Sequence, residues 1–210
     1  MNGDPRTPVL HDTPFAPLVR RIREEALVES NRILKIDHFL NHRIEPAFMA
    51  EMGRAIAERL APAAPDLLLT AEASGIAPAL ATALALGIPL VYAKKYASSV
   101  EIPSYSRLVP SPTKGNSYCL VVAARYLVAG ARVAIVDDFL ANGKTALALA
   151  EIVREAGSAP VAAAFVVEKL FQQGRRRLEE AGVPVVALAR VARLEGARAI
   201  MAGDEGGEVR

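Results

Sequence analysis

One stretch of the chain, Ala131 to Ala146, constrains the fold more than any other; its sequence is ARVAIVDDFLANGKTA. It opens with the apolar run Val133–Val136, whose length suits a strand buried on both faces. Asp137 and Asp138 follow at once, where that strand would surface. The small residues of 141–145 then lead into a helical pattern. The stretch therefore predicts a strand, an acidic pair, a loop and a helix, in that order.

The rest of the chain alternates apolar runs with helical patterns over most of its 210 residues. This alternation favours one α/β domain, with a mostly parallel sheet flanked by helices and joined by right-handed crossovers. We expect residues 17–200 to form that domain, with disordered ends at 1–16 and 201–210. Strands are predicted at 66–70, 88–93, 118–123, 133–136, 161–167 and 183–189, and helices at 18–29, 46–60, 145–157 and 172–181, with a further helix after residue 76 that ends near Leu86.

Residues 96–117 interrupt the alternation, because they contain Ser, Pro, Gly and Tyr without a helical period. A gap of this length inside a compact domain is usually a functional lid or a disordered segment. We expect this segment to close over the functional site.

Composition excludes several classes of partner. The formal net charge is +2 and the basic runs are short, such as Arg175–Arg177, so we expect no nucleic-acid partner. No apolar run approaches the ~18 residues that cross a membrane, and the first residues lack the pattern of a signal peptide. The single cysteine, Cys119, rules out a disulfide within the chain and fits a reducing cytosol, so we expect a cytoplasmic protein.

The acidic pair beside the loop indicates the kind of ligand. A small-residue loop that enters a helix offers backbone N–H groups and the positive end of a helix dipole to a phosphate. Carboxylates repel phosphate, but Asp137 and Asp138 could accept hydrogen bonds from the vicinal hydroxyls of a ribose. A sugar phosphate satisfies both halves of the pattern. The alternative is an ordinary buried strand that ends in a solvated turn.

The same stretch resembles the phosphoribosyl pyrophosphate signature of the type I phosphoribosyltransferases, and the likeness extends over about residues 22–191. The form DDFLANG is similar to the branch of that family that acts on xanthine, although Asn142 and Lys144 depart from the common Thr-Gly-Gly-Thr loop. The resemblance implies a phosphoribosyltransferase core with a small hood from the N- and C-terminal segments. It also implies Mg²⁺ bound mainly through the substrate, and a homodimer.

Two loops and a lysine pair are the expected binding residues for phosphoribosyl pyrophosphate. Ser74 and Gly75 lie in a second strand-to-helix loop, which holds the pyrophosphate in the resembled family. One of Lys94 and Lys95 is expected to reach the pyrophosphate, although a solvated pair is the alternative. We assign no metal ligand in the protein. The expected 5′-phosphate loop consists of Ala141, Asn142, Gly143, Lys144 and Thr145.

Three residues are the candidates for binding the base. Lys169 follows a predicted strand, and its ammonium only donates hydrogen bonds, which favours a 6-oxopurine over adenine. By resemblance, Leu34 would pack on the flat ring, and Asn41 would offer a donor and an acceptor. Without the resemblance, Leu34 is a core residue, Asn41 a turn residue and Lys169 a surface residue.

The expected reaction is transfer of the phosphoribosyl group to xanthine, with Asp137 and Asp138 holding the ribose. A hypoxanthine or guanine enzyme is the second interpretation. A regulator that senses phosphoribosyl pyrophosphate is a third, although the N-terminal extension is too short for a helix-turn-helix domain. A purely structural role leaves both anion loops unexplained.

Overall fold

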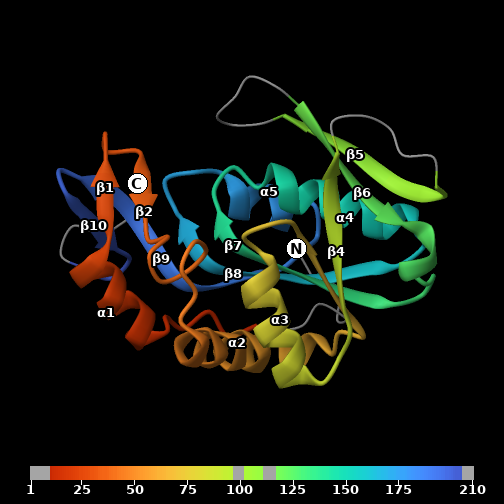
Figure 1. The fold of residues 1–210 in the computed structure, drawn as a ribbon, viewed down its shortest axis with the longest axis horizontal. Helices are drawn as coiled ribbons and strands as arrows, with labels where there is room; N and C mark the ends of the chain where they lie inside the picture. The colour runs from red at the N-terminus through yellow and green to blue at the C-terminus, as the bar shows by residue number, and fades with distance from the viewer. Residues whose placement is uncertain (1–9, 97–101, 111–116, 205–210) are drawn as a thin grey trace.

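The computed structural model describes residues 10–96, 102–110 and 117–204. These residues form one eight-stranded sheet, in the order β10-β9-β8-β7-β3-β4-β6-β5, beside a small β1-β2 hairpin (Figure 1). The five central strands, β9, β8, β7, β3 and β4, run parallel to one another, and antiparallel strands close both edges. The predicted mostly parallel α/β sheet is therefore confirmed. Its strands are β3 (Leu67–Ala71), β4 (Leu90–Tyr96), β5 (Ser104–Pro110), β6 (Ser117–Ala123), β7 (Arg132–Leu140), β8 (Ala159–Lys169), β9 (Val185–Glu195) and β10 (Arg198–Met201).

Helices cover both faces of this sheet (Figure 1). The first three pack on one face and the last two on the other, each through its apolar side. Pro46 begins the second helix, a position where the missing N–H of proline has no helical partner to lose. The helices are α1 (Ala16–Glu25), α2 (Pro46–Leu60), α3 (Ile76–Leu86), α4 (Lys144–Glu155) and α5 (Gly174–Glu180), with single 3₁₀ turns at Ala61–Ala63 and Ala124–Tyr126.

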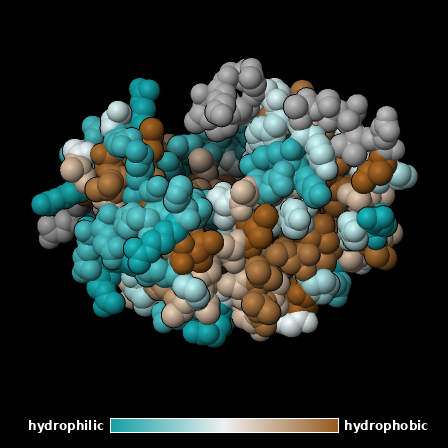
Figure 2. Space-filling model, viewed as in Figure 1, coloured by the Kyte–Doolittle hydropathy of each residue, from teal (hydrophilic) through white to brown (hydrophobic). Residues whose placement is uncertain are grey.

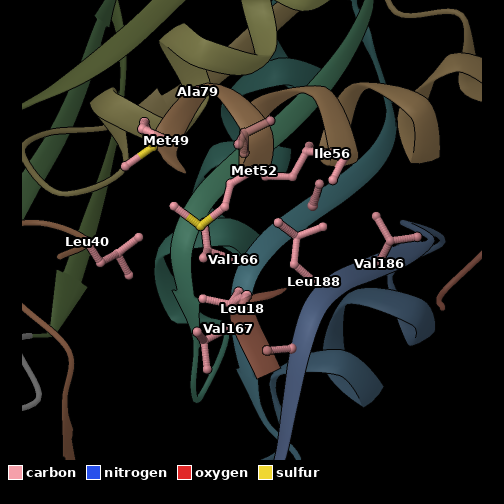
Figure 3. Close-up of a cluster of buried hydrophobic side chains, with 14 of the residues drawn as sticks. Leu18, Leu40, Met49, Met52, Ile56, Ala79, Val166, Val167, Val186 and Leu188 are labelled. Atoms are coloured by element: carbon pink, nitrogen blue, oxygen red, sulfur yellow. The ribbon is translucent and has the colours of Figure 1, made fainter. Parts of the chain in front are cut away.

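The two-sided cover explains the apolar run in β7. Side chains alternate between the faces of a strand, so Ala134 and Val136 join the core under α2 while Val133 and Ile135 join the core under α4. All four are fully buried. Figure 3 shows the first of these cores, in which side chains of α2 such as Met52 meet those of β8 and β9.

The hood is built from both ends of the described chain, as expected. The hairpin of β1 (Leu27–Glu29) and β2 (Ile33–Lys35) lies beside β10, at the same end of the molecule as α1 (Figure 1). The predicted helix at 18–29 is too long, because α1 ends at Glu25 and the chain turns into β1. Leu27 is therefore on an exposed strand face rather than beside the buried Leu18 and Ile22.

Parts of the expected disordered ends are ordered. The N–H of Phe15 donates to the carbonyl of Leu188 at 2.7 Å, and the carboxylate of Asp12 accepts from the N–H of Ala187 at 2.8 Å. At the other end, Met201 is buried in β10 and donates to the Asp204 carboxylate. Residues 10–16 and 201–204 thus belong to the folded unit, while 1–9 and 205–210 lie outside the described residues.

The segment 96–117 also differs from expectation in part. Residues 104–110 form the edge strand β5, whose ladder with β6 places Leu108 opposite Cys119. Its Ser and Pro residues obscured the strand, because an edge strand tolerates proline and takes its stability from its neighbour. Residues 97–101 and 111–116, where the rest of the expected lid falls, lie outside the described part of the chain. No described helix is long and apolar enough to span a membrane.

The contact between α2 and α3 generates a stability prediction. A Cβ at Gly53 would lie 2.5 Å from both the carbonyl carbon and the Cβ of Ala81. Gly53→Ala should therefore lower the free energy of unfolding by about 1–3 kcal/mol, because overpacking outweighs the better helix propensity of alanine. Urea unfolding measures the difference. The exposed Glu51→Ala in the same helix is the control, with an expected change within about 0.5 kcal/mol. A Gly53→Ala protein as stable as wild type would contradict the packing argument.

Candidate active site

The two predicted anion loops meet at one edge of the sheet. β3 and β7 are parallel neighbours, so the loops that follow them emerge at the same edge. The loop after β3 lies against the acidic pair at Gly75, where a Cβ would be 2.4 Å from the Asp137 Oδ1 and 2.3 Å from the Thr70 Oγ1. Only glycine permits this approach. Ser74 is half-buried beside it, and the Glu72–Ala73 peptide of the same loop is cis.

The loop after β7 is held by α5. The Gly174 N–H donates to the carbonyl of Ala141 at 3.0 Å, and the Arg177 guanidinium donates to the carbonyl of Asn142, also at 3.0 Å. Gly143 has φ +74°, and a Cβ there would lie 2.9 Å from the Cα of Gly174. The loop carbonyls are thus engaged by α5. Glycine is therefore required at 143 for two reasons, the positive φ and the close packing against α5.

The first turn of α4 completes this loop. Among the described residues no side chain caps it, so its N–H groups are available to an anion. Lys144 is exposed and Thr145 half-buried at this turn. The loop borders a cavity of about 120 Å³, which Asp137, Phe139 and Tyr118 also line. Sequence reasoning missed both aromatic residues, because neither carries a motif that differs from an ordinary strand position.

The lysine pair divides between the two faces of β4, because adjacent side chains of a strand point in opposite directions. The Lys95 ammonium lies 5.1 Å from the centroid of the Tyr118 ring, and its charge acts on Asp137. Lys94 instead lines a separate hollow with Tyr92 and Tyr96. Of the two lysines, the structure brings only Lys95 to the acidic pair.

The acidic pair has a different environment at each carboxylate. Asp137 Oδ1 accepts from the N–H of Asp138 at 2.9 Å, whereas Asp138 Oδ1 accepts from the N–H of Phe139 at 2.8 Å. Asp138 Oδ2 also accepts from the Asn41 amide at 2.7 Å. Burial raises the pKa of Asp137 well above its ordinary value, the charge of Asp138 raises it further, and Lys95 opposes the shift. The pair therefore resists carrying two charges until cations or donors approach it.

Of the three candidates for binding the base, Lys169 lies between the hood and the sheet. The Lys169 Nζ lies 5.6 Å from the centroid of the Phe139 ring and 3.5 Å from the carbonyl oxygen of Arg32, in the turn before β2. Burial lowers the pKa of Lys169. Asn41 reaches the same region through Asp138, whereas Leu34 is buried in the core between hood and sheet.

A buried ion network supports the end of β8 just before Lys169. Glu168 is 2% exposed and is held by Arg175 of α5 through two hydrogen bonds, of 2.8 Å and 2.5 Å. The same guanidinium donates to Asp12 at 2.8 Å. The N-terminal segment is thereby tied to the end of β8 and to α5 behind the candidate site, a link that charge patterns in the sequence do not reveal.

Comparisons with known proteins agree with this geometry. Residues 42–186 match the phosphoribosyl transferase domain family. A xanthine phosphoribosyltransferase of Chloroflexus aurantiacus is 57% identical over 190 residues, which cover 90% of each chain. One of Deinococcus deserti is 44% identical over 179 residues, covering 85% of this chain and 93% of the other.

Solved structures show the same fold. The adenine phosphoribosyltransferase of Rhodothermus marinus superposes with a TM-score of 0.69 at 21% identity, over 84% of this chain and 99% of the other. That of Saccharomyces cerevisiae has a TM-score of 0.66 at 25% identity, over 82% and 99%. The chain therefore belongs to the type I phosphoribosyltransferase family, in its xanthine phosphoribosyltransferase branch.

Proposed function

We propose that the protein transfers the 5-phosphoribosyl group of phosphoribosyl pyrophosphate to xanthine, giving xanthosine 5′-monophosphate and pyrophosphate. The observation that carries this proposal is the convergence of the acidic pair, the loop 141–145 and Lys169 at one edge of the sheet. The 57% identity to a xanthine phosphoribosyltransferase supports the choice of base. A cytoplasmic role in purine salvage is part of the same proposal.

The sugar phosphate would bind along that edge. The free N–H groups at the start of α4 would receive the 5′-phosphate, with Thr145 beside them. Asp137 and Asp138 would accept hydrogen bonds from the ribose hydroxyls, which relieves the charge repulsion that raises the pKa of Asp137. Lys95 and the loop of Ser74 and Gly75 would hold the pyrophosphate.

In the reaction, a ring nitrogen of xanthine forms a bond to the anomeric carbon as the bond from that carbon to pyrophosphate breaks. The proton on that nitrogen passes to solvent water, and the electron pair of the broken bond leaves with pyrophosphate. The ribose acquires positive charge on the way, which the carboxylates beside it stabilise. Lys95 compensates the charge that develops on the leaving group. The protein thus contributes positioning and charge stabilisation.

The base would lie between the hood and Phe139. Lys169 would donate to the 6-oxo oxygen of the purine, and Asn41 would contact a second edge of the ring. Asn41 already donates to Asp138. The same side chain would therefore contact both the base and the acidic pair. Leu34 is buried in the core, so it would stabilise the hood and would present little of its side chain to the purine ring.

Magnesium would accompany the substrate. The carboxylate oxygens of Asp137 and Asp138 are ligands of the hard type that Mg²⁺ prefers, and this ion keeps several waters when protein ligands are few. When bound, it would neutralise negative charge on the leaving group. Pyrophosphate release with xanthine should therefore require added Mg²⁺ and stop in excess EDTA. Full turnover in EDTA, with the protein still folded by circular dichroism, would remove the metal from the proposal.

A homodimer is also proposed, and an exposed apolar surface supports it. Leu80 and Leu84 of α3 are 50% and 76% exposed, and Tyr92 of the adjoining β4 is 43% exposed. Figure 2 shows apolar side chains gathered over this part of the molecule. Contiguous apolar surface of this kind commonly marks an interface between proteins.

The dimer proposal predicts that Leu84→Glu dissociates the protein. Burying an unpaired charge in an apolar interface is strongly unfavourable, so light scattering should give twice the 22.3 kDa chain mass for wild type and a single chain mass for the variant. Leu27→Glu is the matched control, because Leu27 is 62% exposed in the hood, away from this surface. A wild-type monomer at micromolar concentration would refute the dimer. An unchanged Leu84→Glu dimer would place the interface elsewhere.

Lys169 should select the base. Lys169→Met keeps much of the apolar stem but removes a charge-assisted hydrogen bond worth ~1.5–3 kcal/mol, so kcat/KM for xanthine should fall about tenfold to a hundredfold. Adenine carries an amine in place of the 6-oxo oxygen, so kcat/KM for adenine should fall much less. Rates with xanthine, guanine, hypoxanthine and adenine measure the selection. The exposed hood residue Lys35 provides the control variant Lys35→Met. Unchanged xanthine turnover in Lys169→Met would mean that another residue reads the base.

The lowered pKa of Lys169 adds a pH signature. The hydrogen bond is charge-assisted only while Lys169 is protonated, so its contribution is present at low pH and is lost as the pH rises through the lowered pKa. The ratio of wild-type to Lys169→Met activity should therefore decrease as the pH rises. Because the pKa is lowered, this decrease should occur at a lower pH than the pKa of an ordinary lysine would give. A ratio that stays constant across that range would show that the charge of Lys169 is not used.

A further inference from the structure

Tyr118 joins the two groups that would hold the opposite ends of the sugar phosphate. Its hydroxyl lies 3.1 Å from the hydroxyl of Thr145, in the first turn of α4. The face of its ring lies 5.1 Å from the ammonium of Lys95. Tyr118 also lines the cavity bordered by the loop 141–145 and Asp137. Among the described residues, Tyr118 alone makes both a hydrogen bond to Thr145 and a cation–π contact with Lys95.

An anion at the loop would decide which hydroxyl donates in the hydrogen bond between Tyr118 and Thr145. A threonine hydroxyl has one proton, which it can give either to Tyr118 or to a ligand. An anion at the loop attracts that proton, and once Thr145 donates it to the anion, the Thr145 oxygen can take part in the contact with Tyr118 only as an acceptor. The tyrosine hydroxyl then donates to Thr145, which donates to the phosphate. Such a chain strengthens each bond in it.

The ring contact acts on the other end of the site. Lys95 is an exposed residue of β4, and an unrestrained lysine side chain samples many rotamers. A cation is attracted to the negative face of an aromatic ring. The ring of Tyr118 therefore favours positions of the Lys95 ammonium on the side of the strand that faces Asp137. Lys94, on the opposite face, makes no cation–π contact within the described part of the chain.

We propose that Tyr118 is a positioning residue for both anionic groups of phosphoribosyl pyrophosphate: its hydroxyl orients Thr145 toward the 5′-phosphate, and its ring orients Lys95 toward the pyrophosphate. The proposal rests on the function proposed above. It assigns separate tasks to two parts of one side chain. The two tasks can be separated experimentally, because each anion is available as an independent ligand.

The test uses Tyr118→Phe and Tyr118→Leu, with ribose 5-phosphate and pyrophosphate as ligands in calorimetry. Tyr118→Phe removes one hydroxyl contact and keeps the ring, so affinity for ribose 5-phosphate should fall about three- to tenfold while affinity for pyrophosphate stays within about twofold. Tyr118→Leu removes both and should also weaken pyrophosphate about two- to fivefold. Tyr105→Phe, on the paired strand β5, is the matched control and should bind both ligands as wild type does.

A double-mutant cycle distinguishes positioning from a general structural effect. If Tyr118 acts through Thr145, adding Tyr118→Phe to Thr145→Val should cause no further loss of ribose 5-phosphate affinity. A structural effect would instead give additive losses, together with a lower midpoint of thermal unfolding. Additive losses overturn the proposal, as does a folded Tyr118→Phe protein whose affinities for both ligands equal those of wild type.

Wild-type turnover with xanthine separates this result from the function itself. Turnover by wild type, combined with unaffected Tyr118 variants, rejects the role of Tyr118 and leaves the proposed function intact. A wild-type protein that makes no nucleotide and binds neither ligand rejects both. The expected result is normal turnover by wild type and a selective loss of ribose 5-phosphate binding in Tyr118→Phe.

Discussion

The burial of β7 on both faces is the constraint on which the rest of the structure depends. Its interior residues are apolar on both sides because helices cover both faces of the sheet. Polar chemistry can therefore appear only where this strand leaves the core, at Asp137 and Asp138. The neighbouring β3 is parallel to it and releases its own loop at the same edge. The candidate site is thus a consequence of sheet topology, which gathers two helix-entry loops around one pair of carboxylates.

The site that results is electrostatically incomplete in the free protein. Asp137 is buried beside a second carboxylate, which raises its pKa, and Lys95 compensates only in part. Asp138 gains a donor from the hood through Asn41. A ribose would supply further donors to the same oxygens, so substrate binding and relief of repulsion would occur together. The acidic pair then favours a polyhydroxylated ligand over a bare anion, even though both adjacent loops suit phosphate.

The helix α5 gives this arrangement its rigidity. Gly174 and Arg177 of this helix donate hydrogen bonds to carbonyls of the loop after β7. Its Arg175 forms an ion pair with buried Glu168. A buried carboxylate left without its partner is strongly destabilising, so this ion pair couples the end of β8 to the position of α5. The loop 141–145 and Lys169 are therefore supported by the same short helix. The N-terminal segment joins the network at Asp12, which is why residues expected to be disordered are instead packed against the sheet.

The sequence by itself determined the strand, acidic pair, loop and helix of 131–157, the bounds of α2, and the α/β class, because these depend on local periodicity and on glycine and proline. Phe139 and Tyr118 at the cavity, the strand β5 and the network around Arg175 could not be predicted, because each depends on partners far apart in the chain. The same limit applied to the two lysines of β4. Period-two alternation shows that they face opposite ways, but not which face carries the site. Only the tertiary structure decided that, because the choice depends on which side of β4 the strands β6 and β7 bring Tyr118 and Asp137.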